Sequence, residues 1–197
     1  MQTQTRIAAL LLAAGLSRRM GTSKQLLPLA DKPVIHHCLH TLLATEAHPL
    51  VVVLGPGGEA VQEAIASFPV TIAWNRDPEG DMAGSVRAGL AVLPPDCTGV
   101  LIHLVDHPLV SAATMQALCA AHLANPQSII IPSCNGRQGH PTLFPRGILA
   151  ELTPSVILRD IVRKDPARVL RVPVEDEGIF LDMDTPAEYE AMRQRVS

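Results

Sequence analysis

The sequence lacks the features of a protein that binds nucleic acid over its surface, crosses a membrane or depends on disulfides. Its 197 residues carry 16 Lys and Arg against 19 Asp and Glu, so there is no basic excess. The four cysteines form no CxxC pair, which argues against a zinc knuckle or a disulfide scaffold and favours reduced thiols in the cytoplasm. No segment reaches the ~20 apolar residues of a membrane span. The apolar run of residues 7–16 is followed by an arginine pair, where a signal peptide needs its charge before the run, and no AxA-like cleavage site comes next. We therefore expect any anion to be bound by a local cluster of cations.

The chain instead alternates short apolar runs with longer amphipathic stretches. No linker, internal repeat or low-complexity segment interrupts this alternation, so we expect residues 1–197 to form one domain. The expected strands are 6–13, 50–54, 70–74, 100–105, 128–131, 141–144, 169–174 and a short 179–181. The expected helices are 34–44, 59–68, 85–93, 111–124, 146–152, 155–163 and 187–195. Several of the strands are apolar on both faces, which predicts an α/β fold of three layers with a mostly parallel central sheet.

In such a sheet a ligand binds beyond the carboxyl ends of the strands, and the loop after the first strand is the first candidate. Residues 10–24 read LLLAAGLSRRMGTSK. The small residues 13–15 bring bare backbone close to a ligand, and Arg18, Arg19 and Lys24 can surround a polyphosphate. The loop matches neither the P-loop nor the GxGxxG pattern. It is either a cradle for a triphosphate or a solvated loop that happens to be basic.

Carboxylates follow two other expected strands. Asp106 ends the strand in VLIHLVDHP, and Ser111 is better placed than Asp106 to cap the next helix, which leaves Asp106 as a candidate ligand of Mg²⁺. Asp182 and Asp184 lie two residues apart on an extended segment and share a face, so one or both can join Asp106 at a metal. Residues 185–188 fit a capping box with proline at the first helical position.

Two of the eight histidines, His107 and His140, adjoin the expected cleft. His103 lies in an apolar strand, where we expect a hydrogen-bonded core histidine. The other five lie on or beside expected helices without the spacing of metal ligands: His36, His37, His40, His48 and His122.

With these loops in order, the chain closely resembles the nucleotidyltransferases of molybdenum cofactor biosynthesis, and among them the molybdenum cofactor cytidylyltransferases. The resemblance rests on LLLAAGLSRRMGTSKQLLPL, NRDPEGDMAGSVRAGL, VDHP, GRQGHPTLF, LRDIV and LDMDTPAEYE. The first motif fits the AAGxSxRMGxxK pattern of the wider superfamily, and the GHP and DxDTP elements together narrow it to the cofactor branch.

The resemblance implies a Rossmann-like nucleotidyltransferase fold that transfers CMP from CTP to the terminal phosphate of molybdopterin and releases pyrophosphate. Its implied partners are CTP or another NTP, a molybdopterin-type phosphate and a molybdoenzyme that receives the product. The implied catalytic residues are Arg19, Lys24 and Asp106, with Asp106 and Asp184 holding Mg²⁺. The implied nucleotide-binding residues are Ala13, Ala14, Gly15, Ser17, Arg18, Arg19, Gly21, Lys24, Gly80 and Ser85. The implied acceptor-binding residues are His107, Gly139 and His140.

The chain departs from the pattern at two positions. Asp81 stands where relatives have glycine, so its carboxylate either crowds the nucleotide or marks a shifted turn, and His107 stands where Gln or Met is usual. The alternatives are a guanylyltransferase, whose first loop resembles LAGG where this chain has Ala13 and Ala14, and a sugar- or polyol-phosphate nucleotidyltransferase. A non-catalytic chaperone that binds the cofactor is the alternative outside the enzymes.

Overall fold

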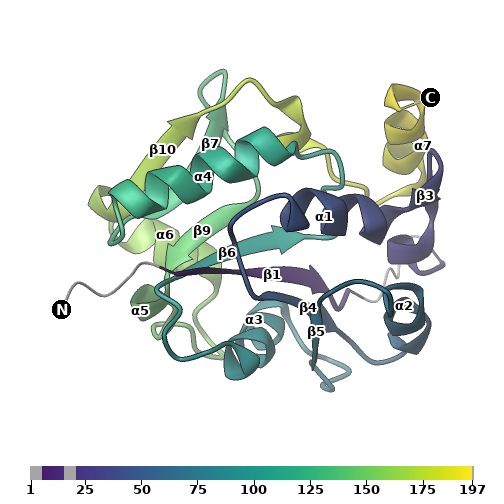
Figure 1. Cartoon of the computed structure of the whole chain (residues 1–197), viewed down its shortest axis with the longest axis horizontal. Coiled ribbons are helices and arrows are strands. Elements are labelled where there is room, and N and C mark those ends of the chain that lie inside the picture. Colours follow the sequence, from purple (N-terminus) through teal and green to yellow (C-terminus); the bar gives the residue numbers. More distant parts are fainter. Residues whose placement is uncertain (1–5, 16–20, 197) are drawn as a thin grey trace.

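A central eight-stranded sheet dominates the computed structural model, which describes residues 6–15 and 21–196 (Figure 1). The strand order is β10 (Val169–Pro173), β7 (Ile129–Cys134), β9 (Thr142–Pro145), β6 (Gly99–Leu104), β1 (Ile7–Ala13), β4 (Leu50–Leu54) and β5 (Thr71–Trp74), with β8 (Arg137–Gln138) paired to β7. All neighbours are parallel except β9, which is antiparallel to β6 and β7, and β8. The prediction of a mostly parallel sheet is therefore confirmed.

Helices cover both faces of the sheet, which makes three layers (Figure 1). One face packs against α1 (Val34–Leu43), α2 (Glu59–Ala64), α4 (Ala112–Ala124) and α7 (Pro186–Arg195). The other packs against α3 (Met82–Val92), α5 (Arg146–Leu149) and α6 (Leu158–Lys164). Strand β1 contributes alternate residues to each core: Ala9 and Leu11 to the first, Leu10 and Leu12 to the second. Its seven residues are all buried, which explains the continuous apolar run in the sequence.

Short elements complete the described part of the chain. They are the two-stranded sheet of β2 (Pro28–Leu29) and β3 (Lys32–Pro33), and the 3₁₀ turns η1 (Lys24–Leu26), η2 (Pro166–Arg168) and η3 (Glu177–Phe180). None of the helices in residues 6–15 and 21–196 has the length and apolarity to cross a membrane. The cysteines at 38, 97, 119 and 134 are free and buried.

Two helix starts follow from their caps as the sequence predicts. The Ser111 hydroxyl accepts a hydrogen bond from Thr114 N at the start of α4. At the start of α7, Thr185 and Glu188 form the reciprocal capping box, with Pro186 at the first helical position.

Several expected boundaries are wrong. The expected strand 179–181 is the turn η3, because the Asp176 carboxylate accepts from Gly178 N and bends the chain there. Helix α3 begins at Met82 and not at 85, because Asp81 caps it. Helices α2 and α5 end earlier than expected, and α6 begins later, at Leu158.

The topology brings the loops of interest to one edge. The carboxyl ends of β1, β4, β5 and β6 meet there because these strands are parallel. Strand β9 runs the other way, with Thr142 opposite Ile102, so its amino end and the preceding His140 lie at that same edge. The GHP segment thus meets the loops after β1 and β6.

Candidate active site

Three charged residues far apart in the sequence meet at this edge. The Lys24 ammonium lies 2.8 Å from Asp106 Oδ2 and 2.9 Å from Asp184 Oδ1. Lys24 comes from η1 after the first loop, Asp106 follows β6, and Asp184 precedes α7. Their side chains are 10%, 19% and 33% exposed, so water screens the charges only in part. The cluster brings together the segments that follow β1, β6 and β10.

The charge state of Lys24 is set by two opposing effects. Burial by itself lowers the pKa of this amine, but the charges and hydrogen bonds of Asp106 and Asp184 outweigh it and raise the pKa above 10.5. Lys24 is therefore a cation at neutral pH. Because the folded-state pKa is the higher one, its stabilising contribution is complete below about pH 10 and is lost only as the pH rises through the raised value.

The carboxylates also suit a divalent metal. Within the described residues no three His, Cys, Asp or Glu side chains group closely enough to hold an ion by themselves. Asp106 Oδ1, however, is buried and has no hydrogen-bond partner there, since His107 Nε2 is 3.9 Å away. Mg²⁺ is commonly held by one or two carboxylates together with the phosphates of a substrate. Asp106 and Asp184 fit this pattern, in which the phosphates of the substrate supply the remaining ligands of the metal.

On one side of the cluster a cavity of about 310 Å³ lies between two loops. Residues 13–15 and 21–23 form one wall, and the glycine-rich segment 55–58 after β4 forms the other. A side chain at Gly55 would collide with the carbonyl oxygen of Ala14, so the two loops approach at the level of bare backbone. Gly21 lines this cavity with φ at +67°. The predicted contacts of Ser17, Arg18 and Arg19 lie outside the described residues.

A smaller cavity of about 160 Å³ is lined by two members of the cluster. It is lined by Lys24 and Asp106 together with Ala14, Gly80 and Ser85, among others. Ser85 is buried, accepts a hydrogen bond from Asn75 Nδ2 at 3.1 Å and donates to the carbonyl oxygen of Asp81 at 3.2 Å. The structure thus brings the predicted loop, glycine and serine residues to the same hollow as the carboxylate.

The departure at Asp81 has a structural explanation. Its carboxylate accepts from Gly84 N at 2.7 Å and caps α3, so it is directed back onto its own helix. The tight position is Gly80, where a Cβ would lie 2.6 Å from Asn75 Nδ2. The structure thus shows Asp81 as the cap of α3 and Gly80 as the position without room for a side chain, and Asp81 also lines two of the cavities.

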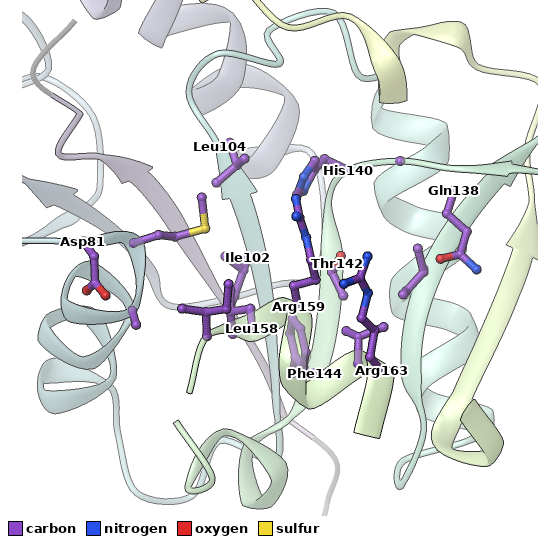
Figure 2. Close-up of a pocket in the computed structure, with 16 residues that line it drawn as sticks. Asp81, Ile102, Leu104, Gln138, His140, Thr142, Phe144, Leu158, Arg159 and Arg163 are labelled. Carbon is purple, nitrogen blue, oxygen red and sulfur yellow. The ribbon is translucent and has the colours of Figure 1, made fainter. Parts of the chain in front are cut away.

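On the other side of the cluster lies a cavity of about 650 Å³ (Figure 2). Its apolar surface includes Ile102, Leu104 and Phe144, with Asp81 and Met82 shared with the smaller cavity. Figure 2 shows Arg159 extending from α6 toward His140, with Arg163 one turn along the same helix. Neither arginine has an ion-pair partner within the described residues. The cavity therefore combines an apolar floor with two available cations.

The two histidines predicted at the cleft do meet. The rings of His107 and His140 lie 4.9 Å apart between centroids, and His140 lines the large cavity. Burial lowers the pKa of both, to about 4 for His140, so both are neutral near pH 7. His103 is buried behind them with its pKa lowered to about 3. The expectation that His103 is fully hydrogen-bonded is wrong, because its Nδ1 has no partner among the described residues.

Gly139 holds the GHP segment against the chain that leads to Asp184. The His140 N–H donates to the carbonyl oxygen of Ile179 at 2.9 Å, and a Cβ at Gly139 would collide with that oxygen.

We expect Gly139→Ala to cost about 1–3 kcal/mol, the range for overpacked sites, which lowers Tm by roughly 2 to 12 °C for a chain of this size. Differential scanning calorimetry measures the change. Gly147→Ala is the control, since nothing lies within 4 Å of its added Cβ; an equal Tm for both variants would contradict the assignment.

Some residues of the site are absent from the sequence-based prediction. The 55–58 segment is not among the predicted site residues, although its place after β4 is a signal that it reaches the carboxyl edge. Arg159 and Arg163 lie in the LRDIV region, whose contact with the cleft depends on how α6 packs. Gln25 lies next to Lys24 in the sequence, and nothing else in the sequence indicates that it belongs to the site.

Relatives of known sequence fall into more than one class of protein. A bifunctional protein GlmU from Kineococcus radiotolerans is 37% identical over 128 residues, 63% of this chain but only 26% of that protein. A nicotine blue oxidoreductase from Paenarthrobacter nicotinovorans is 29% identical over 189 residues, 91% of this chain and 92% of that protein. The chain thus spans about a quarter of the first relative and nearly all of the second.

Solved structures share the whole fold. Rv0371c from Mycobacterium tuberculosis H37Rv superposes with a TM-score of 0.82 at 30% identity, covering 96% of this chain and 98% of that one. A complex of the same protein with manganese superposes at 0.78 and 28% identity, over 96% and 98% of the two chains. The molybdopterin-guanine dinucleotide biosynthesis protein A from Archaeoglobus fulgidus, at 16% identity and a TM-score of 0.68 over 96% and 98%, shares the fold alone.

A family model assigns the chain directly. The model described as a MobA-like NTP transferase domain matches residues 9–172, which include β1, the first loop, Asp106 and the GHP segment. These are the elements that form the carboxyl edge and its cavities. The chain belongs to the family of MobA-like NTP transferase domains, and it is a nucleotidyltransferase of that family.

Proposed function

We propose that residues 1–197 form one nucleotidyltransferase domain that transfers CMP from CTP to the terminal phosphate of a molybdopterin-type acceptor and releases pyrophosphate. The observation that carries the proposal is the position of the Lys24–Asp106–Asp184 cluster between two cavities of different character. A reaction that joins two phosphate-bearing substrates needs a cation and metal ligands at the place where the two substrates meet. The free buried cysteines are in keeping with a reaction in the cytoplasm.

The donor is proposed to bind on the side of the first loop. The cavity there is walled by bare backbone of residues 13–15 and 55–58, which suits a nucleotide held by main-chain groups. Lys24, Gly80 and Ser85 line the adjoining smaller cavity, which shares Ala14 and Gly15 with it. The proposal assigns phosphate contacts to Lys24 and, from the sequence, to Ser17, Arg18 and Arg19.

The acceptor is proposed to bind in the larger cavity. At about 650 Å³ it lies within the range of pockets for small organic ligands. Its apolar floor suits a flat ring system better than a sugar, which disfavours the sugar- and polyol-phosphate alternative. Arg159 and Arg163 supply cations for an anionic group, and the neutral ring of His140 supplies a hydrogen-bonding nitrogen. His107, also predicted to bind the acceptor, packs against His140 and does not line this cavity.

The proposed reaction needs no strong general base. A phosphate oxygen of the acceptor is already anionic near neutral pH, so the task is to bring two polyanions together and to stabilise charge on the α-phosphate and the leaving pyrophosphate. Lys24 and the first loop do this on the donor side. Asp106 and Asp184 are proposed to hold Mg²⁺, which when bound neutralises phosphate charge.

The test is pyrophosphate release from each of the four NTPs with Mg²⁺ and purified molybdopterin. The proposal expects release with CTP that depends on the acceptor. Binding of CTP without any release would favour the chaperone alternative. Absence of release with every NTP would overturn the proposal.

The base preference can be tested at Ala14. If the methyl groups of Ala13 and Ala14 narrow the donor cavity, CTP is preferred to GTP, and Ala14→Gly raises the relative use of GTP by roughly 10- to 200-fold, the range of a shape effect of ~1–3 kcal/mol. Competition assays with mixed CTP and GTP measure the ratio in both proteins. A parent that prefers GTP would favour the guanylyltransferase alternative, and an unchanged ratio in the variant would overturn only the steric explanation.

A further inference from the structure

A buried glutamine lines the donor-side cavity and has no assigned part in the site. Gln25 follows Lys24 in η1 and is 4% exposed. Its Nε2 donates to the carbonyl oxygen of Ala13 at 2.8 Å and to that of Gly15 at 3.0 Å. Its Oε1 accepts from Ser23 Oγ at 2.8 Å. One amide therefore bonds to two main-chain oxygens that flank a single residue, Ala14.

These hydrogen bonds form just beyond the point where the pairing of β1 with β6 ends. The pairing of β1 with β6 ends at Leu12, whose carbonyl oxygen accepts from Val105 N at 3.1 Å. Beyond that point the chain leaves its β6 partner, although Ala13 is still paired with Leu54 of β4. Gln25 supplies one donor to the carbonyl of the buried Ala13, where an oxygen without a partner is costly, and a second donor to that of the exposed Gly15.

The bonds also fix the direction of the loop's own donors. In a trans peptide the N–H points opposite to the carbonyl oxygen, so holding the Ala13 oxygen toward Gln25 turns the Ala14 N–H away from it. The Ala14 oxygen is turned toward Gly55 on the facing loop. The peptide units of this segment are thus oriented before a ligand arrives, in the wall shared by the two donor-side cavities.

The same short turn carries the catalytic cation. Lys24 and Gln25 are consecutive in a 3₁₀ turn, where successive side chains point about 120° apart. The amine of Lys24 reaches Asp106 and Asp184, while the amide of Gln25 reaches the loop. A shift of the turn therefore moves both together.

We propose that Gln25 is a positioning residue for nucleotide binding: by holding the carbonyl oxygens of Ala13 and Gly15, it fixes the main chain of the donor loop in the orientation that binds the NTP and keeps it in register with Lys24. This rests on the proposed function for the identity of the ligand. It assigns Gln25 no contact with the substrates and no step of the chemistry.

The test replaces Gln25 by Met, which is of similar length but cannot donate. The Kd of CTP with Mg²⁺, measured by isothermal titration calorimetry without acceptor, is expected to rise at least ~10-fold, since a pre-oriented site loses less conformational freedom on binding. Gln116→Met is the matched control. Its amide also donates to a main-chain oxygen, that of Ala44 at 3.0 Å, but it lines none of the cavities of the site, so we expect its Kd to stay within ~3-fold of the parent.

Steady-state kinetics separate positioning from a general loss of structure. The KM for CTP is expected to rise in Gln25→Met, while the KM for the acceptor and kcat at saturating CTP stay near the parent values. Gln25→Asn, whose amide is one methylene too short to reach both oxygens, gives a second test if the Met variant does not fold. An unchanged Kd in the folded variant, or a fall in kcat alone, overturns the proposal. A parent that binds no NTP would instead overturn the proposed function.

Discussion

Lys24→Met is expected to reduce pyrophosphate release on the order of 10²- to 10³-fold, the loss seen when one electrostatic stabiliser of a transition state is removed. The Lys24 ammonium touches both Asp106 and Asp184, so its removal leaves two carboxylates facing each other across the reaction centre. It also removes the proposed contact with the phosphates of the donor. Release is measured with CTP, Mg²⁺ and acceptor, alongside circular dichroism to follow folding.

Lys32→Met is the matched control. Lys32 lies 3.7 Å from Asp31 in an exposed ion pair, and such pairs contribute about 0–1 kcal/mol to stability. We expect this variant to turn over like the parent. If Lys24→Met did so as well, the cluster would not be the reaction centre.

Asp106→Asn is expected to lower metal-dependent turnover at least ~10²-fold. The amide keeps the shape of the side chain but removes its charge, and Asp106 Oδ1 is the buried oxygen without a protein partner within the described residues. The Mg²⁺ concentration needed for half-maximal activity should rise in the same variant. A titration of turnover against Mg²⁺ measures both effects.

The two aspartates of the DMD segment provide an internal comparison. Asp184 is half-buried and bonded to Lys24, whereas Asp182 is exposed. Asp184→Asn should therefore behave like Asp106→Asn, and Asp182→Asn should lose much less activity. Greater sensitivity at Asp182 would mean that Asp182, and not Asp184, is the second ligand of the metal.

The central strands are predictable from the sequence because both faces of the sheet are buried. In β1 and β4 every residue is buried, so each appears as an unbroken apolar run in the sequence. Residues 179–181 are equally apolar but form part of a turn, because Asp176 bonds to Ser111, Thr114 and Gly178. Those partners are up to 65 positions away, so no local pattern reveals them.

The sequence predicts which residues belong to the site better than it predicts the contacts between them. Asp106 and Asp184 were expected near one another because both follow elements that end at the carboxyl edge. The direct ion pairs of Lys24 with both carboxylates were not expected, since a basic loop predicts phosphate contacts and does not reveal which acids approach it. The contribution of Arg159 and Arg163 depends on the tilt of α6, which the LRDIV residues alone do not determine.

The strand order has a consequence for how such a protein diversifies. All strands that precede β6 in the sequence lie on one side of it in the main sheet, and all that follow lie on the other (Figure 1). On the assignment proposed above, the donor loops belong to the first half and most of the acceptor cavity to the second. A single recombination after Asp106 would thus exchange the acceptor while keeping Lys24 and the donor loops, so a lineage can acquire a new product without rebuilding its way of holding the triphosphate.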